Sequence, residues 1–231
     1  MKKIVVLTGA GISAESGIKT FRDHDGLWEN YDVMEVASIE GWHKNKELVL
    51  SFYNARRKDL DKVQPNAAHQ ALAELEDKYK VVVITQNVDD LHERGGSTNI
   101  IHLHGELNKV RSIIHHDLIY AWNKDLNLGD TCERGTQLRP HIVWFGEAVP
   151  MLESAVQEIV EADIVLVIGT SMQVYPAASL VGYAPPHCPI HYIDPRPTIN
   201  YELATRKNLT IIEENATTGV RKVVDDLLQL T

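Results

Sequence analysis

Residues 3–14 read KIVVLTGAGISA, in which a short apolar run ends abruptly at a glycine-rich turn. The run is mostly β-branched and too short for a buried helix, so it predicts a strand covered on both faces. Similar runs, each followed by small or polar residues, occur at 81–84, 100–103, 164–168, 190–193 and 209–212. Helical patterns lie between them. Strands that alternate with helices predict an α/β fold with a Rossmann-like, doubly wound parallel sheet, which binds ligands beyond the carboxyl ends of its strands.

Three of the helical patterns have clear limits. Pro65 and Asn66 open the first, and Asn66 is placed to cap it. The second pattern covers 151–161, and the third covers 219–230.

Two stretches, 27–64 and 107–142, interrupt the alternation. The first has a helical pattern, whereas the second is irregular, with scattered Trp, Asp, Asn and Gly. We interpret both as insertions that form a smaller lobe over the ligand-binding edge of the sheet. The chain is then one domain over 1–231, with a large lobe made of 1–26, 65–106 and 143–231.

The composition excludes several classes of protein. The 231 residues carry a formal net charge of −9, which argues against binding nucleic acid through clustered basic side chains. No apolar run approaches the roughly 18 residues of a membrane span, so we expect no membrane partner. Cys132 and Cys188 are the only cysteines. So few thiols are typical of a reducing compartment and favour a cytoplasmic protein.

Gly9, Ala10 and Gly11 begin a G-x-G-x-x-A motif directly after the first expected strand. Such a turn lets the backbone approach a pyrophosphate closely at a helix N-terminus. A purely structural glycine turn is the alternative interpretation. The dinucleotide fingerprint also expects an acidic residue about 20 positions later, at the end of a second strand. No strand precedes the acidic residues found at that distance, so an ordinary hydride-transferring enzyme is disfavoured.

A longer stretch around this motif is more specific. Residues 9–22, GAGISAESGIKTFR, closely resemble the first signature of the sirtuins, which are NAD-dependent protein deacylases. The resemblance covers essentially the whole chain and is weakest over 110–138. Within the family, the sequence resembles the bacterial branch of desuccinylases and deacetylases. Four more sirtuin-like motifs follow in the family's order and approximate spacing: TQNVDDLH at 85–92, HLHG at 102–105, VWFGE at 143–147 and GTS at 169–171.

The resemblance implies catalytic roles for His104, Asn87 and Asp89. In the family, nicotinamide leaves the ribose of NAD, and the carbonyl oxygen of an acyl-lysine attacks the carbon that it leaves. His104 matches the base that takes a proton from the ribose hydroxyls, which suits an imidazole because its ordinary pKa lies near neutrality. Asn87 and Asp89 match residues that position the nicotinamide ribose and carboxamide. The products would be nicotinamide, O-acyl-ADP-ribose and free lysine.

NAD is therefore the expected cofactor. Phe21 and Arg22 match a mobile loop that closes over NAD, where Phe21 screens the reacting carbon from water. Two positions depart from the family pattern, because Lys19 replaces a usual proline and Tyr192 stands where an asparagine normally lies. The residues that the resemblance assigns to NAD are Gly9, Ala10, Gly11, Phe21, Arg22, Trp28, Gln86, Asn87, Val88, Asp89, Gly169, Thr170, Ser171, Tyr192, Asp194 and Ala216.

Acylated lysine side chains of proteins are the partner that the resemblance implies. Residues 143–147 match a strand that takes up the substrate peptide by strand addition, in which main-chain pairing gives affinity with little sequence readout. Simple core packing of Trp144 and Phe145 is the alternative interpretation. The residues assigned to the peptide are Val143, Phe145, Gly146 and Glu147.

Tyr53 and Arg56 are three residues apart, so they would share one face of a helix. This Y-x-x-R pattern resembles the sirtuin branch that removes succinyl and malonyl groups. An arginine fork can bind a carboxylate bidentately, and a tyrosine adds a hydroxyl donor. The alternative is a solvated basic face, to which we assign the neighbouring Arg57 and Lys58. We expect succinyl-lysine to be preferred, with acetyl-lysine also accepted.

Most sirtuins hold a structural zinc ion with two C-x-x-C pairs in the segment that corresponds to 107–142. Here that segment contains Cys132 alone, and Ser112 and Gly135 stand near the positions where thiols are expected. A site of four cysteines is therefore excluded. We predict no zinc and no other metal.

One makeshift alternative remains for zinc, a site made of His115, His116, Asp117 and Cys132. Without a metal, the smaller lobe must be held by its own packing, with Trp122 and Leu126 as candidate anchors. We expect this segment to be looser than in the family, or rebuilt as a short helical hairpin.

Two other functions are compatible with the same motifs. A non-catalytic NAD-binding module would result if the missing cysteines loosened the peptide cleft. An NAD-consuming ADP-ribosyltransferase or hydrolase could use the same nucleotide pocket, and it would release nicotinamide without an acyl peptide. We favour an active NAD-dependent protein-lysine deacylase, a desuccinylase, demalonylase and deacetylase, because the motifs at the reactive end of NAD are retained.

Overall fold

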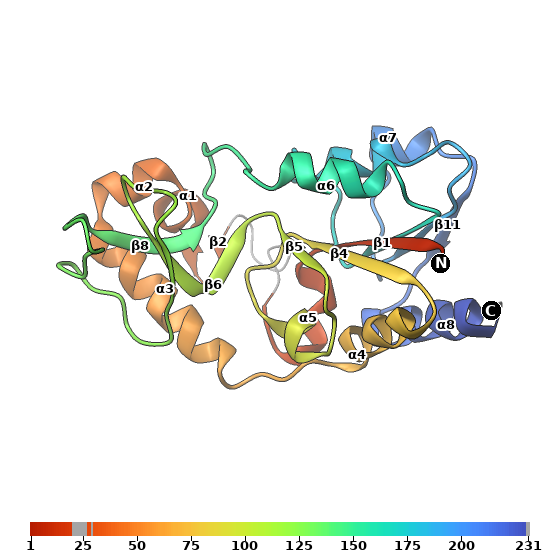
Figure 1. The fold of residues 1–231 in the computed structure, drawn as a ribbon, viewed down its shortest axis with the longest axis horizontal. Coiled ribbons are helices and arrows are strands. Elements are labelled where there is room, and N and C mark those ends of the chain that lie inside the picture. Colours follow the sequence, from red (N-terminus) through yellow and green to blue (C-terminus); the bar gives the residue numbers. More distant parts are fainter. Residues whose placement is uncertain (20–26, 29, 230–231) are drawn as a thin grey trace.

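The computed structural model describes residues 1–19, 27–28 and 30–229, and its main body is a six-stranded sheet (Figure 1). The strand order is β11-β10-β9-β1-β4-β5, and every neighbouring pair is parallel. The chain winds outward in both directions from β1, so the predicted doubly wound α/β fold is confirmed. The strands are β1 (Lys3–Thr8), β4 (Lys80–Thr85), β5 (Ile100–His102), β9 (Ile164–Ile168), β10 (Ile190–Ile193) and β11 (Leu209–Ile212).

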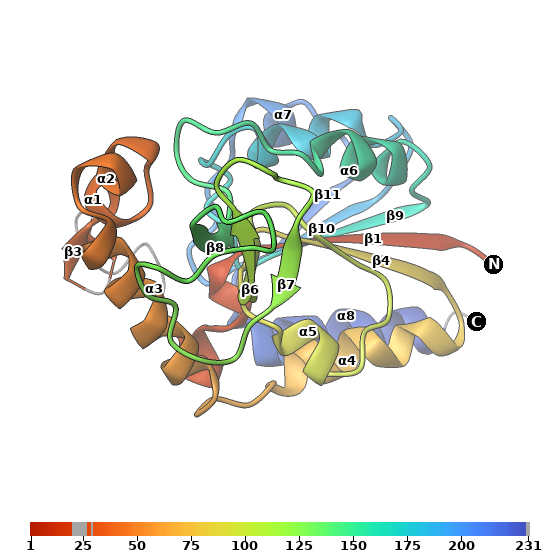
Figure 2. The same cartoon turned by 60° about the vertical axis from the view of Figure 1, so that its left-hand side comes forward.

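Helices cover both faces of this sheet (Figures 1 and 2). One face carries α4 (Ala67–Glu74) and α8 (Ala216–Gln229), and the other carries α6 (Leu152–Ile159), the 3-10 helix η5 (Ala177–Tyr183) and α7 (Tyr201–Ala204). Alternate residues of β1 pack into the two hydrophobic cores on opposite faces of the sheet. Ile4 and Val6 belong to the core with α4 and α8, whereas Val5 and Leu7 belong to the core with α6 and η5. This burial on both faces explains why the strand is apolar at successive positions.

The helices begin at or near the predicted residues. Asn66 is the N-cap of α4, where its side chain accepts a hydrogen bond from the Ala68 backbone, and His69 completes a capping box. Helix α6 lies inside the predicted 151–161. Helix α8 starts at Ala216, three residues before the predicted start at Gly219. Gly219 lies inside the helix and faces the sheet. A Cβ at Gly219 would be only 2.5 Å from Cγ2 of Ile193.

The stretch 27–64 is mainly helical, as predicted. A short hairpin of β2 (Leu27–Trp28) and β3 (Tyr31–Asp32) leads into three helices. These are α1 (Val33–Val36), α2 (Ile39–Lys44) and the long α3 (Lys46–Leu60). The N-cap side chain of each helix accepts a hydrogen bond from a backbone N–H of its first turn, and these caps are Asp32, Ser38 and Asn45 respectively.

The expectation of a short helical hairpin over 107–142 is wrong, whereas a segment looser than in the family stays a prediction. Three antiparallel strands form there in the order β7-β6-β8, namely β6 (Gly105–Ser112), β7 (Ile119–Ala121) and β8 (Leu138–Ile142). The register of β6 on β8 shifts between Glu106 and Val110. Such an irregularity breaks the alternation of apolar and polar residues on which strand prediction depends.

This second sheet and α3 share one hydrophobic core. Leu107 and Val110 of β6 belong to the same buried cluster as Val49 and Tyr53 of α3. Leu126 is fully buried in it and is an anchor as predicted, whereas Trp122 is only partly buried at its edge. The two insertions therefore form one packed unit beside the large sheet (Figure 1).

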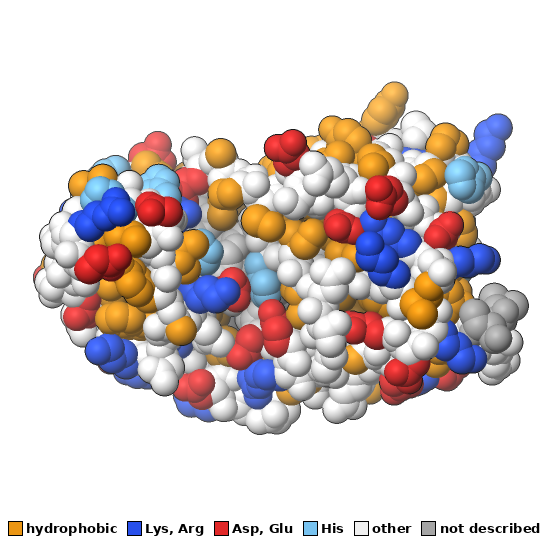
Figure 3. All heavy atoms as spheres, viewed as in Figure 1, with side chains coloured by type: hydrophobic (Ala, Val, Ile, Leu, Met, Phe, Trp, Pro, Cys, Tyr) orange, Lys and Arg blue, Asp and Glu red, His pale blue; other side chains and the backbone are white. Residues whose placement is uncertain are grey.

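Two features of the structure concern the nucleic acid and membrane partners that the composition disfavours, namely the distribution of surface charge and the character of the helices. On the face shown in Figure 3, Lys and Arg side chains are interspersed with acidic ones. Among the described residues, no helix has both the length and the apolar character that a membrane span needs.

Candidate active site

A cavity of 470 Å³ lies at the carboxyl ends of β1, β4, β9 and β10, where parallel sheets bind ligands. Tyr192 and Arg56 do not line it, and Phe21 and Arg22 lie outside the described residues. The residues assigned from the sequence that do line it are Gly9, Ala10, Gly11, Trp28, Tyr53, Gln86, Asn87, Val88, Asp89, His104, Val143, Phe145, Gly146, Glu147, Gly169, Thr170, Ser171, Asp194 and Ala216.

A close contact between two strand ends forms one wall of this cavity. The Gly9 and Gly11 backbone N–H groups donate to the carbonyls of Ile168 and Gly169, at 3.0 and 2.8 Å. A Cβ on Gly11 would lie 2.6 Å from the Cα of Gly169, and Gly169 itself has a φ of +60°. Only glycine fits at these positions, so the motif brings bare backbone to the place where a dinucleotide phosphate can approach.

His104 follows β5 and faces the cavity. Its Nδ1 lies 3.0 Å from the carbonyl oxygen of Gln86, which can only accept, so Nδ1 carries the proton in the neutral ring. Nε2 then holds the free lone pair. Burial lowers the pKa of His104, against the opposing effect of the Gln86 bond. The ring is therefore neutral at pH 7 and can accept a proton through Nε2.

Asn87 and Asp89 are held together by Ser13, a residue that the sequence reasoning missed. Ser13 Oγ donates to Asp89 Oδ2 at 3.1 Å and accepts from Asn87 Nδ2 at 3.2 Å. The Asn87 amide also donates to the Gly9 carbonyl at 3.2 Å. Burial raises the pKa of Asp89 to about 6, although hydrogen bonds from the Leu91 backbone and Ser13 favour its charged form. Ser13 lies within the first signature, so its position in the motif was the available signal.

A buried chain of side chains supports Asn87 from behind. The Asn87 backbone N–H donates to Thr85 Oγ1 at 3.0 Å, Thr8 Oγ1 donates to Thr85 Oγ1 at 2.8 Å, and His92 Nε2 lies 3.0 Å from Thr8 Oγ1. The ring of His92 packs edge-on against that of His69, with centroids 5.0 Å apart. Both rings are buried, and burial lowers the pKa of each, to about 4 for His69.

We expect acid to destabilise the fold through these two histidines. In the unfolded chain His69 has an ordinary pKa near 6.5, so the unfolded state binds a proton first as the pH falls from 6.5 towards 4. This linkage costs on the order of 2 kcal/mol at pH 5 for His69 alone. The drop in Tm between pH 7.5 and pH 5 should therefore be smaller in His69→Asn than in the unaltered chain, by roughly 4–8 °C. Equal drops in both proteins, measured by calorimetry, would contradict the assignment.

The peptide segment 143–147 is a turn, not the expected strand. Strand β8 ends at Ile142, and the Glu147 N–H donates to the Trp144 carbonyl across Gly146, which has a φ of +89°. Only Phe145 makes a β-bridge, with Ser38. The left-handed glycine bends the chain where a strand would continue. Trp144 is buried in the core, as the alternative interpretation holds, whereas Phe145 is exposed.

Two arginines lock this turn. Arg139 donates to both oxygens of Glu147, at 2.6 and 3.0 Å, and Arg111 donates to Oε1 at 3.1 Å. Glu147 Oε2 also accepts from the Trp144 backbone at 2.8 Å. The Arg139 guanidinium stacks 3.4 Å from the centroid of the Trp144 ring. Glu147 therefore has a structural role in addition to lining the cavity.

Tyr53 lines the cavity, whereas Arg56 does not. Tyr53 is fully buried at the cavity wall, and its hydroxyl accepts a hydrogen bond from Trp144 Nε1 at 2.9 Å. Burial raises its pKa, so the hydroxyl keeps its proton and can donate it. Arg56 instead pairs with Asp59 at 2.8 Å and lies over the Phe52 ring.

The assignment of Arg57 to a solvated face is wrong. Arg57 is buried, and it donates to the carbonyls of Leu107 and Lys124 and to Asn54 Oδ1, at 2.9, 3.2 and 2.9 Å. It therefore ties α3 to β6 and to the loop that follows β7. Lys58 is exposed and pairs with Asp125, as expected of a solvated face.

Tyr192 lies behind the cavity wall. Its hydroxyl donates to the Thr170 carbonyl at 2.8 Å and accepts from the Thr198 N–H at 3.1 Å. The tyrosine therefore supports the position of Thr170, whose own hydroxyl accepts from Gln86 Nε2 at 3.1 Å. Tyr192 itself does not line the cavity, so its assignment to NAD stays a prediction.

The residues near the expected zinc position do not fit a zinc site. Ser112 Oγ lies 2.6 Å from Thr136 Oγ1, and Cys132 Sγ lies 3.0 Å from the same hydroxyl. His115 Nδ1 lies 3.2 Å from the Arg134 guanidinium, whose charge disfavours a cation there. One thiol with two hydrogen-bonded hydroxyls does not supply the four ligands of a structural zinc.

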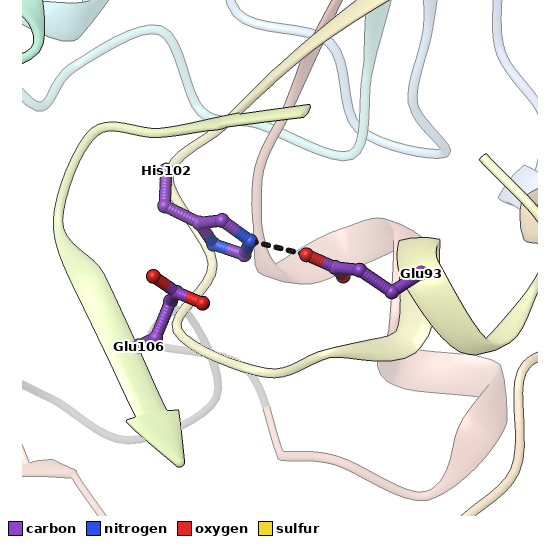
Figure 4. Close-up of side chains that lie close together, drawn as sticks. All are labelled: Glu93, His102 and Glu106. Carbon is purple, nitrogen blue, oxygen red and sulfur yellow. Dashed lines mark hydrogen bonds and ion pairs between the residues drawn. The ribbon is translucent and has the colours of Figure 1, made fainter. Parts of the chain in front are cut away.

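Among the described residues, one group of three side chains has ligand-type atoms close enough for a metal, namely Glu93, His102 and Glu106, within 4.8 Å of one another (Figure 4). The quartet of His115, His116, Asp117 and Cys132 does not form such a group in that part of the chain. Both ring nitrogens of His102 are already engaged with protein atoms, Glu93 and the Asn87 carbonyl. A metal would have to displace one of these bonds.

Comparison with known proteins places the chain in a family. A model of the Sir2 family matches residues 9–176. An NAD-dependent protein deacylase of Helicobacter pylori is 56% identical over 230 residues, which cover 100% of this chain and 99% of the relative. A solved structure of a Sir2 homolog in complex with NAD is 39% identical with a TM-score of 0.88, covering 99% of this chain and 90% of that one.

A more distant solved structure, of a mutant Sir2 with a p53 peptide and NAD, is 30% identical with a TM-score of 0.78. It matches 98% of this chain and 93% of its own. The glycine turn, the residues after β4 and the histidine after β5 thus occur in a fold that is similar over its whole length to NAD-bound proteins. The chain belongs to the Sir2 family of NAD-dependent protein deacylases.

Proposed function

We propose that the chain transfers acyl groups from protein lysine side chains to the ADP-ribose part of NAD, with His104 as the base. The observation that carries this proposal is the hydrogen bond of His104 Nδ1 to the Gln86 carbonyl, which leaves Nε2 basic at the cavity wall. The ring lies in the same cavity as the glycine turn and the Asn87–Ser13–Asp89 cluster.

The residues around the cavity suit the parts of NAD. The bare backbone at Gly9, Gly11 and Gly169 would face the phosphates, and Thr170 and Ser171 would add hydroxyl donors. The amides of Gln86 and Asn87 and the carboxyl of Asp89 would orient the nicotinamide carboxamide and its ribose. Bound NAD would supply an electrophilic ribose carbon as nicotinamide leaves. His104 Nε2 would then take a proton from a ribose hydroxyl.

The partner that fits the cavity is an acylated lysine of a protein segment. The rigid turn at 143–147 exposes Phe145 beside the cavity, while its neighbour Trp144 stays fixed in the core. Because Glu147 already holds this backbone in place, little conformational entropy is lost when a peptide pairs with it. The p53 peptide bound by the distant relative is consistent with a protein substrate.

The acyl group that we propose as preferred is succinyl or malonyl, with acetyl also accepted. Tyr53 presents a protonated hydroxyl at the cavity wall. This hydroxyl accepts a hydrogen bond from Trp144 Nε1, and among the described residues it donates to no protein group. Arg56 lies one helical turn further along α3 and is held by a surface ion pair with Asp59. Such a pair contributes little, so an acyl carboxylate can compete for the guanidinium.

The deacylase proposal is tested by product analysis. Mass spectrometry of reactions with NAD and acetyl-, succinyl- or malonyl-lysine peptides should show nicotinamide and O-acyl-ADP-ribose in equal amounts with free lysine. Nicotinamide release that does not depend on the acyl peptide would instead indicate NAD hydrolysis or ADP-ribosyl transfer.

We also propose that the antiparallel sheet β7-β6-β8 is stable without zinc. The hydroxyl of Thr136 joins Ser112 to Cys132, and Arg57 ties β6 to α3, so hydrogen bonds and the shared core hold the segment. Prolonged treatment with a chelator should leave Tm and deacylase activity unchanged, and metal analysis of the purified protein should find no stoichiometric zinc. One zinc per chain, with loss of Tm on chelation, would refute the proposal.

A further inference from the structure

His102 lies between two groups that can only accept hydrogen bonds, and Figure 4 shows one of them, the Glu93 carboxylate. Its Nε2 is 2.7 Å from Glu93 Oε1, and its Nδ1 is 3.3 Å from the backbone carbonyl oxygen of Asn87. A neutral imidazole has one N–H, so it can donate to one of these groups but not to both. The two bonds form together only when the ring carries two protons and a positive charge.

The charges around His102 agree with this imidazolium form. Helix α5 (Leu91–Arg94) presents Glu93 and the buried, neutral His92, and the turn before it presents Asp89. Strand β6 presents Glu106, which pairs with Lys109 at 2.7 Å. Burial lowers the pKa of His102, but the bond to Glu93 and the charges of Glu93 and Glu106 outweigh it and raise the pKa above its usual value.

His102 and His104 hold two consecutive carbonyl groups of the chain. His104 Nδ1 binds the carbonyl of Gln86, and His102 Nδ1 binds the carbonyl of Asn87. The surroundings push the two rings towards opposite protonation states. Burial without a carboxylate lowers the pKa of His104, whereas Glu93 raises that of His102. Such divergence between neighbouring groups is how a site separates an acid from a base.

We propose that His102 is a positioning residue that works as an imidazolium: fixed by Glu93, it holds the Asn87 backbone so that the Asn87 amide faces the NAD pocket. The neutral His104 beside it remains free to accept a proton. This inference rests on the proposed roles of Asn87 and His104 in the deacylase reaction. The protonation state of His102 can nevertheless be measured without any reaction.

The proposal predicts two opposite pH effects on kcat/KM for NAD. Activity falls at low pH as His104, with its lowered pKa, becomes protonated and can no longer act as a base. Activity also falls at high pH as His102 loses its second proton above its raised pKa and releases the Asn87 carbonyl. The result is a bell-shaped profile whose alkaline limb belongs to His102.

The protonation state is tested first, by NMR of the unaltered chain labelled with ¹⁵N-histidine, with the His102 signals assigned through His102→Gln. We expect both ring nitrogens of His102 to be protonated at pH 7, and those of His104 to show the neutral form with the proton on Nδ1. A neutral His102 ring at pH 7 would overturn the proposal, whatever the activity of the protein.

The kinetic test compares pH profiles of kcat/KM. His102→Gln should lack the alkaline limb and lose about tenfold in rate at the optimum, because one charge-assisted hydrogen bond is gone. Glu93→Gln should keep the limb but move it to lower pH, since the carboxylate that stabilises the cation is removed. His43→Gln, at an exposed histidine, is the matched control and should keep the unaltered profile.

Retention of the same alkaline limb in both His102→Gln and Glu93→Gln would overturn the proposal, because a merely structural histidine changes the rate without changing the pH dependence. Failure of the deacylase proposal has a different signature. A charged His102 by NMR, together with full activity in His104→Ala, would remove the proposed base but leave the assignment of His102 intact.

Discussion

Replacing His104 with alanine is expected to lower kcat for NAD-dependent deacylation by about 10²- to 10⁴-fold, the range in which a positioned general base contributes. The bond from Nδ1 to the Gln86 carbonyl fixes the ring and leaves Nε2 as the basic nitrogen. No other described imidazole lines the cavity. The measurement is the rate of O-acyl-ADP-ribose formation with acetyl- and succinyl-lysine peptides, and both reactions should be lost to the same extent.

The controls for this experiment separate chemistry from folding. His187→Ala removes an exposed histidine outside the cavity and should leave the rate unchanged. Added imidazole should restore part of the activity of His104→Ala, because the truncated side chain leaves room for the free base. A His104→Ala protein that keeps its Tm and retains most of its kcat would remove the base from the proposed mechanism.

Replacing Arg56 with methionine is expected to reduce kcat/KM for succinyl-lysine by roughly 10- to 100-fold, while the value for acetyl-lysine changes little. The loss corresponds to one charge-assisted interaction with a carboxylate, worth about 1.5–3 kcal/mol. Acetyl-lysine carries no acyl carboxylate, so its binding does not depend on this interaction with Arg56. The ratio of the two kcat/KM values, measured by product formation, is the readout.

Variants on the same helix sharpen this test. Lys58→Met removes an exposed cation two residues away and should leave the ratio unchanged. Asp59→Asn removes the present partner of Arg56 and should keep or raise the preference for succinyl-lysine. Tyr53→Phe should also lower the ratio, but it leaves Trp144 Nε1 without an acceptor, so its Tm must be compared. Equal loss of both reactions in Arg56→Met would refute the selectivity role.

The large sheet could be predicted from the sequence because its signals are local. Strand β1 is buried on both faces, so every position in the run Ile4–Leu7 must be apolar, and the pattern is visible without a partner strand. The cap at Asn66 and the glycine turn at Gly9 and Gly11 also depend on neighbouring residues or on backbone conformation. The site motifs follow these strand ends, so most of the assigned residues meet in one cavity.

What the sequence could not predict depends on residues far apart in the chain. Arg57 is buried because its acceptors come from Leu107 and Lys124, at separations of 50 and 67 residues. The hydroxyl of Tyr53 is tied to Trp144, 91 residues away. Strand β6 lacked a clear alternation because its register shifts midway. In each case the contact that determines the structure joins residues far apart in the sequence. Helical spacing along α3 alone predicted a solvated position for Arg57, which is buried.

The hydrophobic core shared by α3 and the β7-β6-β8 sheet limits how this protein can be recombined with its relatives. Both inserted segments contribute buried side chains to that interior, and Trp144, from outside both segments, is buried in the same cluster. In a chimera that takes only one segment from another sirtuin, the side chains of the two segments would not be complementary in shape, and the shared core would pack poorly. The segments can therefore be exchanged only as a pair, although a long stretch of unrelated sequence separates them in the chain.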